Sequence, residues 1–135
     1  MFFAASSGSA PADMPDARLT PGDVTQRDTA AVCAYGNAAR HRKVSYRTRD
    51  RVYLAYGIPR GRRKGRYEID HLVPLELGGS NRPANLWPQP LGDAKKKDRV
   101  EDRLHELVCN GQMPLDAAQR AIERDWHTAV PANLR

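Results

Sequence analysis

The clearest pattern of hydrophobic and polar positions lies in the last third of the chain. Residues 93–109 carry apolar side chains at helical spacing, with most charged side chains on the other faces. The stripe consists of Val100, Leu104, Leu107 and Val108. Gly111 ends this predicted helix, and a second stripe that runs from Pro114 to Trp126 predicts another. The two stripes together indicate a helical hairpin.

The first part of the chain predicts shorter elements. Residues 1–22 are rich in Ala, Ser and Pro, which is typical of a disordered leader, and their start also reads like the end of a signal peptide. A short helix is expected over 25–33, and a clearer one over 46–56, which Gly57 and the following proline would stop. We therefore expect a leader over 1–22 and one domain over 23–135.

Alternating apolar and polar side chains at 67–70 predict a strand. Residues 72–77 can supply at most a short second strand, because Pro74 interrupts it before the Gly78–Gly79 pair turns the chain. The expected fold class is therefore α+β, with a short two-stranded hairpin in a mainly helical small domain.

The charge of the chain points to a polyanionic partner. Lys and Arg total 22 against 16 Asp and Glu, which gives a net charge of +6. Half of the basic residues fall within 40–66, beside a single acid, Asp50. A solvated surface that only keeps the protein in solution is the alternative interpretation. A basic cluster this one-sided favours binding to a nucleic acid.

The two cysteines, Cys33 and Cys109, permit one disulfide or remain two buried thiols. Neither lies in a Cys-x-x-Cys pair, which excludes a cysteine-built zinc knuckle. A disulfide and a signal-peptide remnant would fit a secreted or periplasmic bacterial protein, and free thiols would fit a cytoplasmic one. No apolar run approaches the ~18 residues that a spanning helix needs, so we expect no membrane segment.

The stretch 67–90 sets an acid and an imidazole side by side. Hydrolysis of a phosphodiester needs a base that takes a proton from water and a cation that offsets the charge on the phosphate. His71 can be that base, and Asp70 can hold the cation. Neighbouring side chains of a regular strand point to opposite faces, so the two converge only if the strand ends there. Asn85 could then pin the following loop by hydrogen bonds to its backbone.

These parts, in this order, resemble the HNH endonuclease family, the ββα-metal or His-Me finger nucleases, and the flanking segments are similar to a small bacterial branch of it. The resemblance implies a ββα-metal motif with His71 as general base, Asp70 as metal ligand and Asn85 as the residue that ties the loop. It is carried by Asp70, His71, Pro74, Gly78, Gly79, Asn85, Leu86 and the lysine-bearing helix that follows.

One position departs from that family. The family supplies a second metal ligand early in the helix, usually His or Asn, and the best-matching residue here is Lys95. A protonated lysine cannot ligate a metal. Either Asp93 or Asp98 fills the coordination sphere, or Lys95 takes over part of the cation's role and is itself catalytic, or the protein is a weakened enzyme.

The resemblance implies a metal-dependent endonuclease that hydrolyses double-stranded DNA with little sequence preference. We expect one divalent ion, Mg²⁺ first, with Mn²⁺, Ni²⁺ or Zn²⁺ as alternatives, and a monomeric protein. Two other functions stay open: a nucleic-acid-binding protein that keeps the fold without the chemistry, and a basic secreted module that binds anionic cell-wall polymer. The residues expected to hold the DNA backbone are Arg60, Arg62, Arg63, Lys64, Arg66, Lys96 and Lys97.

Overall fold

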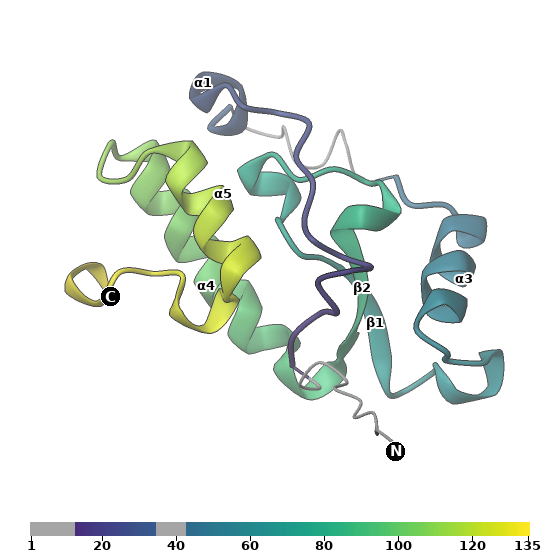
Figure 1. Cartoon of the computed structure of the whole chain (residues 1–135). Helices are drawn as coiled ribbons and strands as arrows, with labels where there is room; N and C mark the ends of the chain where they lie inside the picture. The colour runs from purple at the N-terminus through teal and green to yellow at the C-terminus, as the bar shows by residue number, and fades with distance from the viewer. Residues whose placement is uncertain (1–12, 35–42) are drawn as a thin grey trace, which may run out of the picture.

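The computed structural model describes residues 13–34 and 43–135, and these form an α+β unit with one small antiparallel sheet (Figure 1). The α+β class expected from the sequence is confirmed. The elements in chain order are α1 (Thr29–Val32), α3 (Tyr46–Ala55), β1 (Tyr67–His71), β2 (Leu86–Pro90), α4 (Leu91–Cys109) and α5 (Leu115–Arg124). None of the helices in the described ranges is long and apolar enough to cross a membrane.

The sheet pairs β1 with β2, and the prediction of a second strand within 72–77 is wrong. In that segment Leu75–Leu77 forms a short 3₁₀ helix, and the partner strand follows only after the loop 72–85. Asp70 lies opposite Trp87 in the antiparallel register, and His71 lies opposite Leu86. The loop therefore carries the chain from the end of β1 back to the start of β2.

The sequence pattern does not predict β2, because this strand contains two prolines, Pro88 and Pro90. One backbone hydrogen bond lies just beyond each end of the sheet. The Leu72 N–H donates to the Asn85 carbonyl at one end, and the Leu91 N–H donates to the Arg66 carbonyl at the other. Because bonded positions alternate along an antiparallel strand, the prolines of β2 fall on the positions whose nitrogens face away from β1. A two-stranded sheet therefore tolerates a strand of sequence LWPQP.

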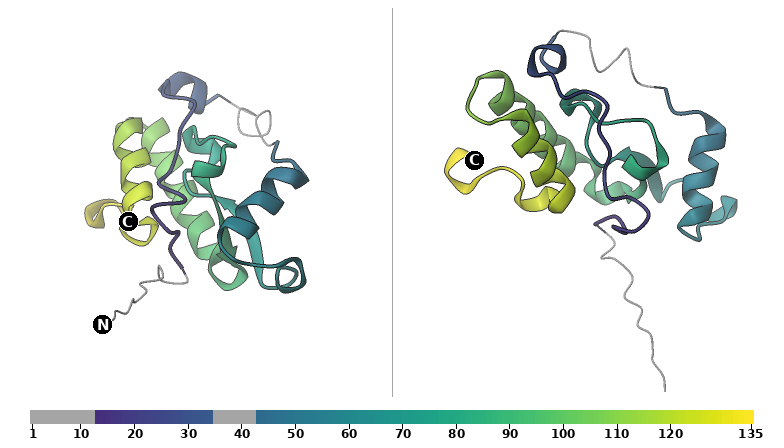
Figure 2. Two further views of the ribbon diagram at one scale, coloured as in Figure 1. Left: turned by 45° about the vertical axis from the view of Figure 1, so that its right-hand side comes forward. Right: turned by 45° about the horizontal axis from the view of Figure 1, so that its top comes forward.

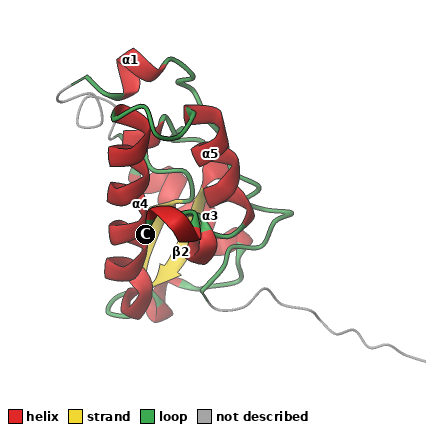
Figure 3. Ribbon diagram, turned by 90° about the vertical axis from the view of Figure 1, so that its left-hand side faces the viewer, coloured by secondary structure: helices red, strands yellow, loops and turns green. Residues whose placement is uncertain are grey.

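The helical hairpin predicted from the two apolar stripes is present: α4 and α5 run side by side (Figure 3). The second helix ends at Arg124, earlier than expected, because Asp125 adopts an extended backbone. Trp126 instead reaches the core from a short 3₁₀ turn. The apolar core lies between the hairpin, the loop 72–85 and α1, and includes Val32, Val73, Leu77, Leu104, Leu107, Val108, Ile122 and Trp126.

Residues 13–22, which the sequence assigns to a leader, pack along the body of the protein (Figure 2). Thr20 is buried, and its hydroxyl donates to the Leu86 carbonyl at 3.0 Å. The Gly22 N–H donates to the Ala84 carbonyl at 2.9 Å. These bonds attach the segment to the start of β2, which it helps to fix. Residues 1–12 lie outside the described ranges.

Cys33 and Cys109 form a disulfide, so the alternative of two free thiols does not hold. The bond joins the end of α1 to the end of α4 across 76 residues of sequence, with the Cα atoms 5.7 Å apart. It docks the N-terminal part of the chain on the helix that follows the sheet. A structural disulfide is typical of an oxidising compartment.

Candidate active site

A cleft of about 420 Å³ opens where β1 ends, and both Asp70 and His71 line it. The two neighbouring side chains share one cleft because the strand stops at His71 and the chain turns into the loop 72–85. The opposite wall comes from α4, through Asp98 and Glu101, and the loop contributes Glu76.

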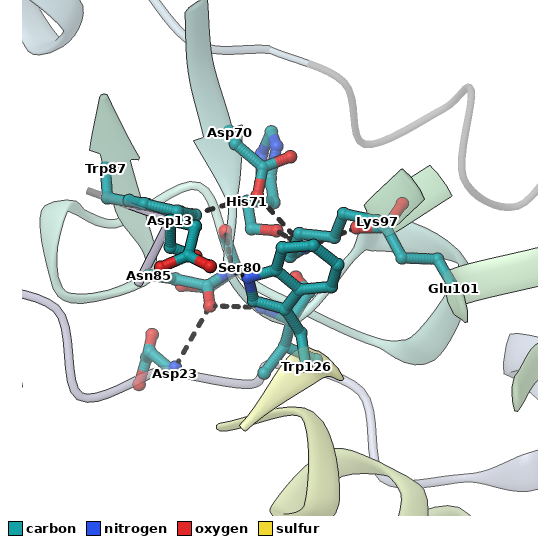
Figure 4. A network of polar contacts seen from close by, with 11 residues as sticks. Asp13, Asp23, Asp70, His71, Ser80, Asn85, Trp87, Lys97, Glu101 and Trp126 are labelled. Carbon is teal, nitrogen blue, oxygen red and sulfur yellow. Dashed lines mark hydrogen bonds and ion pairs between the residues drawn. The ribbon is translucent and has the colours of Figure 1, made fainter. Parts of the chain in front are cut away.

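Asn85 ties the loop together. Its side chain is fully buried, and Oδ1 accepts from the Val73 N–H at 2.9 Å and from the Asp23 N–H at 3.3 Å. Nδ2 donates to the carbonyls of Val73 and Ser80, both at 2.9 Å (Figure 4). A Cβ on Gly79 would lie 1.8 Å from the Val73 carbonyl oxygen, so this close turn requires a glycine. One amide thus joins both arms of the loop and the N-terminal segment.

The imidazole of His71 is half-buried and contacts Asn81, which lies two residues after the Gly78–Gly79 pair. His71 Nε2 lies 2.7 Å from Asn81 Oδ1. The loop folds back on itself and brings the two residues together across ten positions of sequence. Asn81 is not among the residues predicted from the sequence. Its only signal there is a polar side chain that follows two glycines and a serine.

The carboxylate of Asp70 is anchored through one of its two oxygens (Figure 4). Oδ2 accepts from Trp87 Nε1 at 2.9 Å and from Lys97 Nζ at 3.0 Å. The strand register places Trp87 opposite Asp70, which makes the first of these contacts. Among the residues that the structure describes, no hydrogen bond reaches Oδ1.

Lys97, one of the residues expected from the sequence to hold DNA, lies in the interior. It is fully buried, and besides Asp70 its ammonium contacts Glu101 Oε2 at 2.5 Å and the His71 carbonyl oxygen at 2.9 Å. Burial opposes its charge, but the Asp70 and Glu101 carboxylates outweigh burial and raise the pKa of Lys97. Lys97 and Glu101 lie two turns and one turn before Leu104 on the buried stripe of α4, a signal that the run of three lysines concealed.

The lysine that the resemblance places at the second-ligand position lies elsewhere. Lys95 is exposed and does not line the cleft. The α4 residue in contact with Asp70 is Lys97, two positions further along. Of the two acids considered as substitutes, Asp98 lines the cleft, whereas Asp93 lies outside its lining.

The cleft concentrates negative charge. Burial, together with repulsion from Asp102 and Asp98, raises the pKa of Glu76 to about 7. Burial and the Asp70 carboxylate likewise raise the pKa values of Asp98 and Glu68. Carboxylates that resist ionisation because they repel one another gain from a bound cation. The cleft is therefore an electrostatically suitable place for a divalent ion.

The cleft acids do not form a closed cage of ligands. Among the described residues, the one group of three His, Cys, Asp or Glu donor atoms within 4.8 Å of one another is Cys33, His105 and Cys109. Its two sulfurs are joined in the disulfide and are not available as thiolates. A cation in the Asp70 cleft would instead keep several water ligands, which is the habit of Mg²⁺.

Arg63, expected to contact DNA, serves the fold instead. Its guanidinium pairs with Asp50 at 2.8 Å, donates to the Ile58 carbonyl at 3.2 Å and lies 4.6 Å from the centre of the Tyr53 ring. Its side chain is only 12% exposed. Arg60 contacts the same aspartate but remains 72% exposed, so it can still reach a phosphate.

The other residues expected to hold the DNA backbone are exposed. The Leu91 N–H donates to the Arg66 carbonyl, which sets the start of α4 beside the start of β1. This open end of the sheet lies at the far end of β1 from His71. The exposed basic residues that precede β1 or lie in the first two turns of α4, here called the basic rim, are Arg60, Arg62, Lys64, Arg66, Lys95 and Lys96.

Comparisons of the chain with protein-family models, curated proteins and solved structures find no match.

Proposed function

We propose that the protein is a metal-dependent endonuclease of the HNH type, which hydrolyses phosphodiester bonds of DNA at the Asp70–His71 cleft. The observation that carries the proposal is the convergence of these two side chains at the end of β1, against α4, with the loop between the strands held by Asn85. The order strand, pinned loop, strand and helix supports the ββα arrangement that the resemblance implies.

His71 is the proposed general base. An amide oxygen can only accept a hydrogen bond, so the contact with Asn81 Oδ1 requires a proton on Nε2. In a neutral imidazole the other nitrogen, Nδ1, is then the one that takes a proton from water. The Asn81 contact also fixes the plane of the ring, because the imidazole cannot rotate without losing it. The role of Asn81 is therefore to orient His71.

Asp70 is the proposed ligand for one divalent ion. Its Oδ2 already accepts from two donors, so Oδ1 is the oxygen that would bind the ion. Asp98, on the facing wall of the cleft, is the second candidate. When bound, Mg²⁺, or Mn²⁺, Ni²⁺ or Zn²⁺ in its place, would offset the negative charge that develops on the phosphate and the leaving oxygen. A cation would also ease the approach of a phosphate, because five acids and one arginine, Arg49, are among the described residues that line the cleft.

The basic rim is the proposed grip on the DNA backbone. Its residues are exposed just before β1 and in the first two turns of α4, and the chain carries a net charge of +6. Contacts to phosphates carry no sequence information, so we propose little sequence preference. The disulfide further supports a secreted or periplasmic location.

The test is cleavage of supercoiled plasmid by the purified chain with Mg²⁺, Mn²⁺, Ni²⁺ or Zn²⁺, and with EDTA. The expected result is nicked and linear DNA with at least one metal, none with EDTA and none from His71→Ala. His127→Ala is the matched control, because that exposed histidine pairs with Asp13 and Asp125 away from the cleft and its loss leaves cleavage intact. Absence of cleavage by the unaltered chain with every metal refutes the proposal.

One observation favours a second candidate, a nucleic-acid-binding protein without the chemistry. The Lys97 ammonium already neutralises part of the charge on Asp70, which weakens the attraction of Asp70 for a metal. In that case the plasmid would bind to the chain, in a salt-dependent manner, and stay intact.

A further inference from the structure

Lys97 has no donor left for a substrate. An ammonium has three N–H groups, and the structure gives it three acceptors: Asp70 Oδ2 at 3.0 Å, the His71 carbonyl at 2.9 Å and Glu101 Oε2 at 2.5 Å. Its exposed fraction is 0%. The side chain therefore neither grips DNA nor reaches a reacting phosphate.

Its contacts reach both residues of the proposed chemistry at once. The bond to the His71 carbonyl holds the backbone at the end of β1, where the chain must leave the strand for both side chains to share the cleft. The bond to Oδ2, together with that of Trp87, fixes the plane of the Asp70 carboxylate and leaves Oδ1 for the cleft. One side chain from α4 thus sets the geometry of two neighbouring groups of β1.

Stability of the fold does not explain why residue 97 is a lysine. Taking an ammonium and two carboxylates out of water is costly, and an apolar side chain of similar volume often fills such a place with equal or greater stability. A methionine in place of Lys97, with an uncharged partner in place of Glu101, would pack the same space without that cost. What an apolar pair cannot supply is the hydrogen bonds to Asp70 and to the His71 carbonyl.

We propose that Lys97 is a positioning residue of the active site: its buried ammonium, held by Glu101, locks Asp70 and the His71 backbone in the geometry that cleavage requires. This inference rests on the proposed nuclease function. It assigns to Lys97 a role distinct from that of the exposed lysines beside it, which belong to the basic rim.

The experiment uses Lys97→Met and the double variant Lys97→Met with Glu101→Gln. The single variant leaves the buried Glu101 carboxylate without its lysine and can therefore lose the fold. The double variant removes both charges of the pair, so we expect it to keep the fold. Arg103→Met is the matched control, because it removes another α4 cation whose guanidinium donates to the Leu134 carbonyl away from the cleft. For each chain we would measure urea unfolding, DNA affinity without metal, and single-turnover cleavage with Mg²⁺ or Mn²⁺.

In the folded double variant we expect cleavage to fall at least about 100-fold, the scale at which misplaced catalytic groups lose rate. DNA affinity should stay within about twofold, since Lys97 makes no contact with solvent, and Arg103→Met should keep both quantities. Lys97→Ala adds a rescue test: n-propylammonium, which restores the missing carbons and the charge, should recover part of the cleavage, whereas n-propanol should not.

Cleavage within about threefold of the unaltered chain in the folded double variant overturns the positioning role and leaves the nuclease function standing. Rescue by n-propanol as effective as by n-propylammonium overturns it too, because the positive charge would then not be needed. If the unaltered chain does not cleave DNA at all, the proposed function fails first and this inference fails with it.

Discussion

The amide of Asn85 gives the sharpest prediction for the loop that shapes the cleft. The change Asn85→Asp keeps the size of the side chain and the acceptor Oδ1, but replaces the donor Nδ2 by an oxygen. That oxygen would face the carbonyl oxygens of Val73 and Ser80, each of which now receives a hydrogen bond of 2.9 Å. Two attractive contacts therefore become two repulsive ones in a fully buried position.

The expected loss follows from these contacts. Each buried acceptor left without a donor costs about 1–3 kcal/mol, so two of them cost about 2–6 kcal/mol. Folded domains are stable by about 5–15 kcal/mol, so Asn85→Asp should remove a large share of the free energy of unfolding. Burial also raises the pKa of the new carboxyl, so its neutral form predominates in acid and can donate to one carbonyl. The loss should be smaller at pH 5 than at pH 7.5.

Urea denaturation at the two pH values measures this directly. Asn133→Asp is the control, since Asn133 is exposed and the change adds the same charge without touching the loop. A loss below about 1 kcal/mol at pH 7.5, or equal losses at the two pH values, would show that the Asn85 amide does not hold the loop.

Three further predictions concern other parts of the chain. The pKa of Glu76 is raised to about 7, so its ionisation lowers stability as the pH rises from about 4.5 through 7. Glu76→Gln should therefore stabilise the protein more at pH 8 than at pH 5, by about 1–2 kcal/mol after allowance for partial exposure, as measured by urea unfolding. Reduction of the Cys33–Cys109 disulfide should cost about 4 kcal/mol in the same assay. Neutralising Lys64 and Arg66 should reduce the log–log salt slope of DNA binding by about 2, as measured by fluorescence anisotropy, and an unaltered slope would remove them from the DNA contact.

The local patterns of the chain predicted much of the fold. The apolar stripes of α4 and α5 and the alternation in β1 predicted elements that the structure contains. β2 was missed, because prolines are read as strand breakers and only the pairing partner shows which nitrogens face away from it. The packing of 13–22 was missed too, since its bonds to Leu86 and Ala84 join segments more than sixty residues apart.

The candidate site was also predicted only in part from the sequence. Asp70, His71 and Asn85 were selected from their residue types and order, and the structure brings the first two into one cleft and sets the third in the loop between the strands. Among the helix lysines, the resemblance selects Lys95 for the second-ligand position, whereas the lysine in contact with Asp70 is Lys97. Three consecutive lysines look alike in sequence, and only the phase of the buried stripe distinguishes Lys97 from Lys95.

As the proposed general base, His71 takes the proton from water during DNA hydrolysis, and the single-turnover cleavage rate of His71→Ala measures this role. The measurement uses a saturating concentration of protein, a short labelled duplex and the metal that supports plasmid cleavage. A positioned general base contributes about 10²- to 10⁴-fold in rate and little to ground-state binding. We predict a loss in that range with DNA affinity unchanged within about twofold. A rate within about threefold of the unaltered chain would show that His71 is not the general base.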